Sequence, residues 1–171
     1  MKIRVADYVV KFLENRSISH AFMVTGGGAM FLNDGIAKSK KIQGVFNHHE
    51  QASAMAALGY SKVDNEIAIV IPTTGCGGTN TITGLLDAWQ DSNKVVFISG
   101  NVKYKETTHE MDLPLRKLGV QEANIVSIVK PITKYSKMVN NPLDIRKVLE
   151  EAFYECENGR PGPVWIDIPM D

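Results

Sequence analysis

The sequence predicts an α/β fold: a doubly wound, mostly parallel six-stranded sheet with helices on both faces, in a flavodoxin-like topology. Strand-like runs alternate with helical segments along the chain, as in right-handed βαβ units. Residues 67–71 and 95–98 are continuously apolar, which is typical of parallel strands buried on both faces. The 171 residues, 44% hydrophobic and 22% charged, fit one globular domain spanning 1–171.

The first helix is indicated by a single apolar stripe with the spacing i, i+3, i+4, i+7 and i+8. The stripe consists of Val5, Tyr8, Val9, Phe12 and Leu13. Further helices are expected at Ala29–Lys38, Gln51–Lys62, Thr79–Asp91 and Pro142–Cys156. Strands are expected at His20–Val24, Gly44–Asn47, Ile67–Pro72, Lys94–Gly100, Thr133–Val139 and Pro163–Ile168. The remaining long segment, Asn101–Gln121, is polar and without periodicity, which is typical of a functional or mobile loop.

Composition excludes several classes of protein. The 19 basic and 19 acidic residues cancel, so the chain lacks the positive field of a nucleic-acid or membrane-surface binder. Cys76 and Cys156 are too few for a disulfide framework and suit a reducing compartment. There is no signal-peptide pattern and no apolar run long enough to span a bilayer. We therefore expect a cytoplasmic protein, or a piece of one.

Glu50 is the first candidate for chemistry. It follows the β-prone run 45–47 and opens a helix made of small residues, so it is expected at the carboxyl edge of the sheet, where α/β proteins bind ligands. A helix N-terminus suits a carboxylate electrostatically. The small residues of 52–59 would let another backbone approach closely, which indicates an acid held against a partner surface.

Two glycine-rich turns, 24–29 and 72–80, follow strand-like runs. Glycines allow backbone N–H groups to point at a ligand. Neither turn fits the dinucleotide fingerprint or the phosphate-binding P-loop, and each alone is explained as a tight strand-to-helix connection. Together with Glu50 at the same edge, they favour a ligand cleft.

The second turn carries a resemblance to a known family. Residues 73–80 and 83–92 resemble the Gly-Pro-Gly-Ala-Thr-Asn block and the Asp-Ala-aromatic-x-Asp-Ser tail of the acetolactate synthase group of thiamine diphosphate enzymes. Residues 24–28 match the group's Pro-Gly-Gly turn, and 118–126 resemble its Phe-Gln-Glu block. Two further blocks complete the set, at 130–134 and 159–169. The resemblance covers essentially the whole chain, in order.

This resemblance implies the N-terminal pyrimidine-binding domain of a thiamine diphosphate enzyme acting on a small 2-oxo acid. It implies that Glu50 hydrogen-bonds N1′ of the aminopyrimidine and so promotes removal of the proton from thiazolium C2. The implied cofactor-binding residues are Thr73, Thr74, Gly75, Cys76 and Asn80. The implied substrate-side residues are Gly26, Gly27 and Gln121.

Some of these residues have a second interpretation. Asn80 could instead satisfy backbone donors at a helix start. Cys76 could be a nucleophile activated by a helix N-terminus, but no base is identifiable beside it, so we expect it to line the pocket. His48 and His49 are adjacent at a strand end, where side chains point different ways, and no further ligands are evident, so no metal site is expected in this chain. His49 matches a family histidine and suits the site rim or an interface.

Three positions depart from the family pattern. Cys76 stands where Pro is usual, Val120 where Phe is usual, and His48 where Arg is frequent. Because the Phe position lies near the substrate in the family, Val120 keeps two alternatives open. These are a plain 2-oxo acid decarboxylase and an enzyme that transfers a two-carbon unit to another acceptor. A third alternative, from a different class, is a non-catalytic nucleotide- or flavin-binding module.

The family's diphosphate-and-magnesium motif, Gly-Asp-Gly followed by Asn, does not occur in the sequence. Mg²⁺ and the cofactor's diphosphate are therefore expected on a diphosphate-binding domain of a second subunit, and this chain alone is expected to be inactive. An excised domain of a longer three-domain enzyme is favoured over a natural separate subunit. A homodimer is expected through the Glu50–Tyr60 and Thr79–Asp91 helices. FAD is compatible with the family, but its contacts lie mostly outside this domain.

Overall fold

The computed structural model describes residues 2–109 and 114–171. The strands are β1 His20–Met23, β2 Gln43–Phe46, β3 Ala68–Ile71, β4 Val95–Asn101, β5 Tyr135–Met138 and β6 Val164–Pro169. The helices are α1 Val5–Asn15, α2 Met30–Lys38, α3 Glu50–Asp64, α4 Cys76–Thr79, α5 Ile82–Gln90, α6 Ile125–Val129 and α7 Ile145–Glu157. Short 3₁₀ turns lie at Gly27–Ala29, Tyr104–Glu106, Lys130–Ile132 and Pro142–Asp144.

The strands form one parallel sheet in the order β2-β1-β3-β4-β6-β5. The predicted doubly wound α/β architecture is confirmed. The first four strands follow the flavodoxin order 2-1-3-4, whereas β6 lies between β4 and the edge strand β5. The chain leaves β1 toward β2 and later leaves β3 toward β4, so the direction of winding reverses between the adjacent strands β1 and β3.

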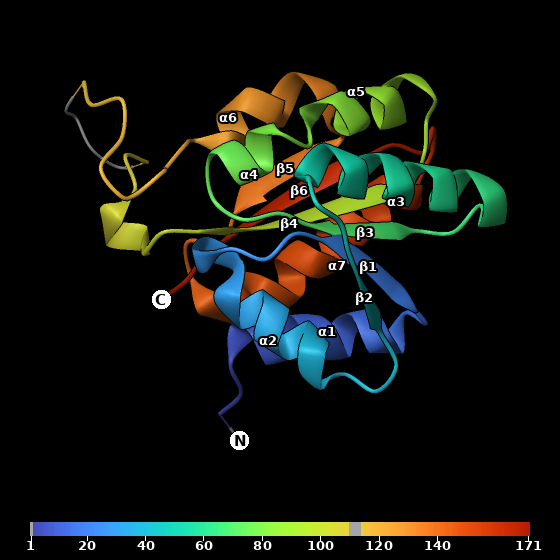
Figure 1. Cartoon of the computed structure of the whole chain (residues 1–171), viewed down its shortest axis with the longest axis horizontal. Coiled ribbons are helices and arrows are strands. Elements are labelled where there is room, and N and C mark those ends of the chain that lie inside the picture. The colour runs from blue at the N-terminus through green and yellow to red at the C-terminus, as the bar shows by residue number, and fades with distance from the viewer. Residues whose placement is uncertain (1, 110–113) are drawn as a thin grey trace.

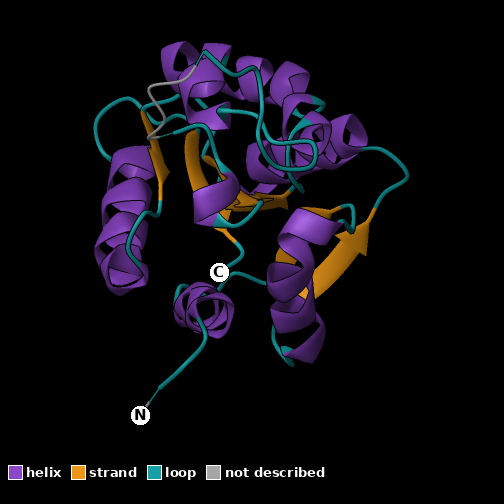
Figure 2. Cartoon of the chain, turned by 90° about the vertical axis from the view of Figure 1, so that its left-hand side faces the viewer, coloured by secondary structure: helices purple, strands orange, loops and turns teal. Residues whose placement is uncertain are grey.

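Helices cover both faces of the sheet. α1, α2 and α7 lie on one face, and α3, α4, α5 and α6 lie on the other (Figure 1). Seen from the side, the strands lie between these two helical layers (Figure 2). The apolar run of β3 serves both layers, because Ile69 and Ile71 pack into the core under α1 whereas Ala68 and Val70 pack into the core under α3. This alternation explains why the strand has no polar face.

The structure differs from the predicted elements in the second half of the chain. The helix expected at Thr79–Asp91 is α5, which begins only at Ile82, because Thr79 ends the separate helix α4. The hydroxyl of Thr81 between them donates to the carbonyl of Gly78 at 2.7 Å. The sequence did not predict α6, because its five residues are too short to show a helical period. The polar segment after β4 is mostly irregular in its described part, and residues 110–113 lie outside the described residues.

No helix in the described part of the chain has both the length and the apolar character required to cross a membrane.

Candidate active site

A cavity of about 590 Å³ opens at the carboxyl edge of the sheet. Its walls are the turns that follow β1, β3 and β4, together with the first residue of α3. These turns surround the point where the winding direction reverses between β1 and β3, which is where open α/β sheets bind their ligands. The volume lies within the ~300–1,000 Å³ typical of small-molecule sites.

Glu50 lies in this cavity as the first residue of α3. The preceding residue, His49, caps the helix: its Nδ1 accepts a hydrogen bond from the backbone N–H of Gln51 at 3.1 Å. The cap fixes the helix start at which Glu50 lies. The sequence placed His49 at the site rim or an interface, and the structure adds this capping role.

Asn80 holds one oxygen of that carboxylate. Its Nδ2 donates to Glu50 Oε2 at 2.9 Å, across the groove between the end of α4 and the start of α3. The other oxygen, Oε1, has no hydrogen-bond partner among the described residues and lies 3.4 Å from where a Cβ would stand on Gly77. The interpretation of Asn80 as a partner of backbone donors at a helix start is therefore wrong, because Asn80 lies at the end of α4 and its amide bonds the Glu50 carboxylate.

The turn after β3 is packed against the turn after β1. The hydroxyl of Thr73 accepts from the backbone N–H of Gly28 at 3.1 Å, and a Cβ on Gly26 would lie 2.5 Å from the Thr73 side chain. The hydroxyl of Thr74 donates to the carbonyl of Gly100 at 3.1 Å, which joins the same turn to the end of β4. Glycine at position 26 is thus required for this close approach.

Gly75 supports the cavity from behind without lining it. Its φ of +61° and ψ of −116° belong to a region that other residues rarely adopt, and a Cβ there would collide with the carbonyl oxygen of Gln121. Gln121 has a positive φ of 57° and lines the cavity. The turn after β3 and the turn that contains Gln121 are therefore in direct backbone contact at Gly75.

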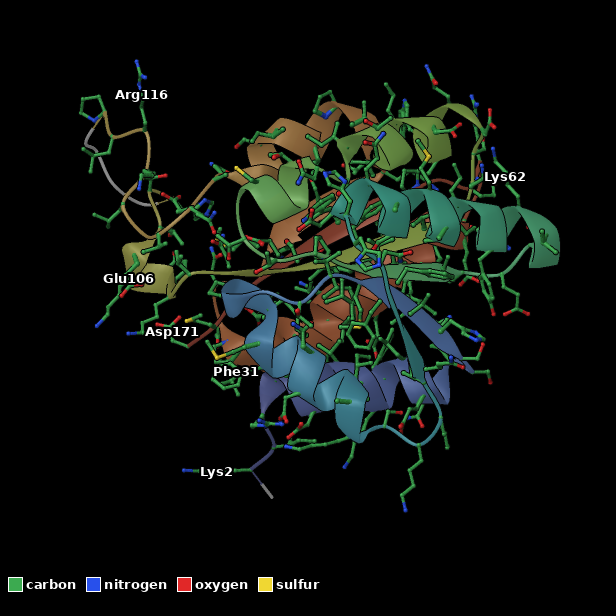
Figure 3. All side chains as sticks on the ribbon, in the orientation of Figure 1. Lys2, Phe31, Lys62, Glu106, Arg116 and Asp171 are labelled. Atoms are coloured by element: carbon green, nitrogen blue, oxygen red, sulfur yellow. The ribbon has the colours of Figure 1, made fainter. Side chains whose placement is uncertain are left out.

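The structure thus brings together nearly all the residues singled out from the sequence. Those that line the cavity are Gly26, Gly27, Glu50, Thr73, Thr74, Cys76, Asn80 and Gln121. Cys76 is exposed and forms no disulfide within the described residues. The sequence reasoning did not single out Met30, Val102, Lys103, Glu106 and Met170, which also line it. In the sequence, Val102, Lys103 and Glu106 were indicated only by their place in the long polar segment. Figure 3, in which Glu106 is labelled, shows this segment at the carboxyl edge of the sheet.

A buried polar network lies beneath the site. Asp167 on β6 accepts hydrogen bonds from Ser99 Oγ at 2.5 Å and from Asn101 Nδ2 at 2.7 Å. Trp165 Nε1 in turn donates to Ser99 Oγ at 2.8 Å. The pKa of Asp167 is raised to about 6, mainly because the group is buried and to a lesser extent because of the nearby Glu122 carboxylate, while the hydrogen bonds from Ser99 and Asn101 act in the opposite direction. This network holds the end of β4 in place, and the segment that follows β4 lines the cavity with Val102, Lys103 and Glu106.

The polar groups that line the cavity are two carboxylates (Glu50 and Glu106), the amides of Asn80 and Gln121, hydroxyls, a thiol, one ammonium and backbone groups. Within the described residues there is no group of three or more His, Cys, Asp or Glu side chains that could hold a metal ion. The arrangement fits an uncharged polar ring that meets Glu50 Oε1 better than it fits a phosphate or a metal, since Lys103 on the rim is the one cation among the lining residues.

Comparison with known proteins identifies the family. Residues 3–127 match the family model described as "Thiamine pyrophosphate enzyme, N-terminal TPP binding domain". The chain belongs to this family. Related proteins include the chloroplastic acetolactate synthase of Arabidopsis thaliana, 37% identical over 169 residues, which are 97% of this chain and 24% of that protein.

Bacterial relatives show the same pattern. The acetolactate synthase large subunit of Lactococcus lactis is 36% identical over 166 residues, covering 97% of this chain and 28% of the relative. That of Haemophilus influenzae is 35% identical over 170 residues, covering 99% of this chain and 28% of the relative. The thiamine pyrophosphate enzyme domain described here therefore spans about a quarter of the length of these relatives.

Proposed function

We propose that this domain binds the aminopyrimidine of thiamine diphosphate and supplies the activating glutamate for an acetolactate synthase-like reaction on a 2-oxo acid. The observation that carries the proposal is the position of Glu50. It is the one carboxylate that lies at the switch point of the sheet with one oxygen held by Asn80 and the other left free toward the cavity.

The cavity residues fit the aminopyrimidine. A Cβ on Gly27 would meet no atom within 4 Å, so glycine at this position leaves space for a flat ring to lie against the backbone of the turn. The free Oε1 of Glu50 can share a proton with a ring nitrogen, and the Asn80 amide keeps Oε2 from turning away. Thiamine diphosphate, when bound, supplies the nucleophilic carbon and the electron sink for decarboxylation.

The chain's own residues then have three tasks. Glu50 holds or releases the proton at the ring nitrogen, a general acid–base role that is typically worth ~10²–10⁴ in rate. Thr73, Thr74 and Cys76 form the wall behind the ring. Gly26, Gly27 and Gln121 form the wall on which the substrate would lie.

Val120 bears on the substrate. Its side chain is 80% exposed and lines the cavity mouth, so it leaves room that a larger aromatic residue would fill. The extra room is compatible with two alternative reactions, which are plain decarboxylation of a 2-oxo acid and transfer of a two-carbon unit to another acceptor. A nucleotide- or flavin-binding module is less well supported, because such a module needs a phosphate site in a glycine turn and has no use for Glu50.

The remaining partners are proposed from the resemblance to the family. A diphosphate-binding domain of a second subunit, with Mg²⁺, would complete the site, and FAD would be bound outside this domain if at all. The outer faces of α3 and α5 are proposed as the contact between two copies. The plant relatives are named as chloroplastic, so the cytoplasmic compartment rests only on the composition of this chain.

The test is carbon dioxide release from pyruvate by the full-length enzyme with added thiamine diphosphate and Mg²⁺. Glu50→Gln keeps the size of the side chain but cannot exchange a proton in the same way, and we expect turnover to fall by ~10²–10⁴. Glu150→Gln is the matched control, because Glu150 is an exposed acid paired with Arg146. Unchanged turnover in Glu50→Gln would remove this acid from the chemistry. Absence of turnover in the unaltered enzyme would direct the search to other 2-oxo acids.

A further inference from the structure

Glu122 is a buried carboxylate for which the proposed chemistry has no use. It is 7% exposed and accepts three hydrogen bonds. Two come from Thr108, from its backbone N–H at 3.0 Å and its hydroxyl at 2.9 Å, both to Oε1. The third comes from the backbone N–H of Leu118 at 3.0 Å to Oε2. One side chain thus joins two positions ten residues apart in the segment that follows β4.

The same segment is fastened to the cavity rim at two further points. The N–H of Gly119 donates to the carbonyl of Glu106 at 2.8 Å, and a Cβ on Gly119 would lie 2.8 Å from Val102 Cγ2. The N–H of Glu122 donates to the carbonyl of Gly119 at 3.3 Å, closing the turn that contains Val120 and Gln121. The described part of this segment extends beyond the end of the sheet (Figure 1).

Gln121 lies in that turn with a left-handed backbone conformation, which is unfavourable unless surrounding contacts stabilise it. A left-handed φ costs a residue with a Cβ ~1–2 kcal/mol, and Gln121 has a φ of 57°. Its carbonyl oxygen packs against Gly75, and it lines the cavity. A strained residue persists only where its surroundings over-determine it. The surroundings here are the Gly75 contact on one side and the carboxylate of the next residue on the other.

We infer that Glu122 is a positioning residue: its carboxylate, by holding Thr108 and Leu118, keeps Gln121 directed into the cavity on the substrate side. The inference rests on the proposed function, in which Gln121 forms the substrate wall. Glu122 acts through Gln121, so its effect on turnover should disappear once the Gln121 side chain is gone. A residue that merely stabilises the fold would not behave in this way.

The experiment is a double-mutant cycle in the full-length enzyme with Glu122→Gln, Gln121→Ala and the pair. In Glu122→Gln one acceptor oxygen becomes an NH₂ group that faces an N–H or O–H donor. The hydrogen bonds to either Thr108 or Leu118 are therefore lost. We expect turnover to fall ~10–100-fold, since misplacement by about 1 Å can cost that much. In the Gln121→Ala background the same change should cost less than about twofold. Losses that multiply in the double variant would overturn the inference.

Hydrogen exchange gives a readout that does not depend on turnover or on a bound cofactor. In Glu122→Gln, peptides containing the amides of Thr108 and Leu118 should exchange faster, whereas Glu150→Gln should match the unaltered enzyme. Unchanged exchange at both positions would show that the carboxylate does not hold the segment, and would overturn the inference. If Glu122→Gln fails to fold, Thr108→Val removes one donor and keeps the acid. It should show the same non-additivity with Gln121→Ala on a smaller scale, and additive losses would again contradict it.

The outcomes separate this inference from the proposed function. A collapse of turnover in Glu50→Gln, together with additive effects at 121 and 122, leaves the cofactor role supported and removes the positioning role. Unchanged turnover in Glu50→Gln removes the proposed function itself, whatever the exchange data show.

Discussion

At the scale of single residues, backbone conformation at the turn after β3 decides the shape of the cavity. Gly75 adopts a φ of +61°, and the carbonyl of Gln121 occupies the space of the Cβ that it lacks. Thr73 and Thr74 on the preceding positions make hydrogen bonds to the neighbouring turns, so this glycine is enclosed by polar contacts that cannot shift independently.

Gly75→Ala is therefore expected to be destabilising. The backbone strain alone is worth ~1–3 kcal/mol, and the collision with Gln121 adds to it. Gly27→Ala is the control for stability, since a Cβ there meets no atom within 4 Å. Urea unfolding of the 171-residue chain measures both, and a Gly75→Ala variant as stable as Gly27→Ala would show that the turn can relax.

Asp167 makes stability depend on pH. Its pKa is raised from 3.8 to about 6 by burial, so between these values the folded protein keeps a proton that the unfolded chain has lost. The free energy of unfolding should therefore decrease as pH rises through this window, by up to about 3 kcal/mol from this group, and level off above it. Ser99, Asn101 and Glu122 are the groups that act on it, and none of them reverses the sign.

Asp167→Asn removes this ionisation and keeps the shape of the side chain. The free energy of unfolding of the unaltered chain minus that of the variant should decrease as the pH is raised from 4 to 6.5. A constant offset introduced by the new amide does not change this trend. Denaturant unfolding at half-unit pH steps measures the difference. A difference that does not vary with pH would mean that Asp167 stays ionised throughout.

At the scale of elements, α3 and α5 pack with their backbones unusually close. A Cβ on Gly84 of α5 would lie 2.6 Å from Ala54 Cβ and 3.0 Å from the Ala54 carbonyl carbon in α3. The small residues of α3 are therefore used partly inside the domain, against α5, and not only toward a partner. Asn80 reaches Glu50 across this same contact, so the packing of two helices sets the geometry of the acid.

Two glycine-to-alanine variants separate packing from helix propensity. Gly84→Ala should destabilise the chain by ~1–3 kcal/mol through overpacking. Gly59→Ala, at an exposed position in α3 with no atom within 4 Å of the added Cβ, should stabilise it by ~0.5–1 kcal/mol. Thermal unfolding of the two variants measures the contrast, and equal shifts would contradict the close contact between the helices.

At the scale of the whole molecule, the face formed by α3 and α5 is one of the places where apolar side chains are exposed. Met55 of α3 and Leu86 of α5 are exposed beside the small residues Ala52 and Gly59, on the face that Figure 1 shows above the sheet. We expect this apolar surface to be an interaction site. It adjoins Glu50, so a partner bound there would cover one side of the cavity.

We expect the chain to self-associate through this face. Leu86→Lys should shift the protein toward monomer in sedimentation velocity, because a charge would be buried in the contact. Leu143→Lys is the matched control, since Leu143 is 86% exposed on the 3₁₀ turn before α7. A dimer unaffected by Leu86→Lys, or one broken equally by Leu143→Lys, would place the contact elsewhere.

The sequence alone determined the architecture and predicted most of the residues that line the cavity. Alternation of apolar runs with helical periods predicts a parallel α/β sheet, because each βαβ unit has one handedness and both faces of the sheet must be covered. The glycine turns and Glu50 could be assigned to the carboxyl edge because parallel strands all end on the same side. The α6 helix and the break between α4 and α5 were not predictable, because both depend on one or two capping contacts and not on a periodic pattern.

Only the tertiary structure decided which atoms meet. Asn80 and Glu50 are thirty residues apart, and Asp167 meets Ser99 across sixty-eight, so no local pattern encodes either contact. Their distances depend on how closely helices and strands from different parts of the chain approach, which is set by glycines such as Gly84. The sequence determines which residues reach the edge of the sheet, because that follows from strand order and direction. The orientation of each side chain at that edge follows from packing, which only the folded chain defines.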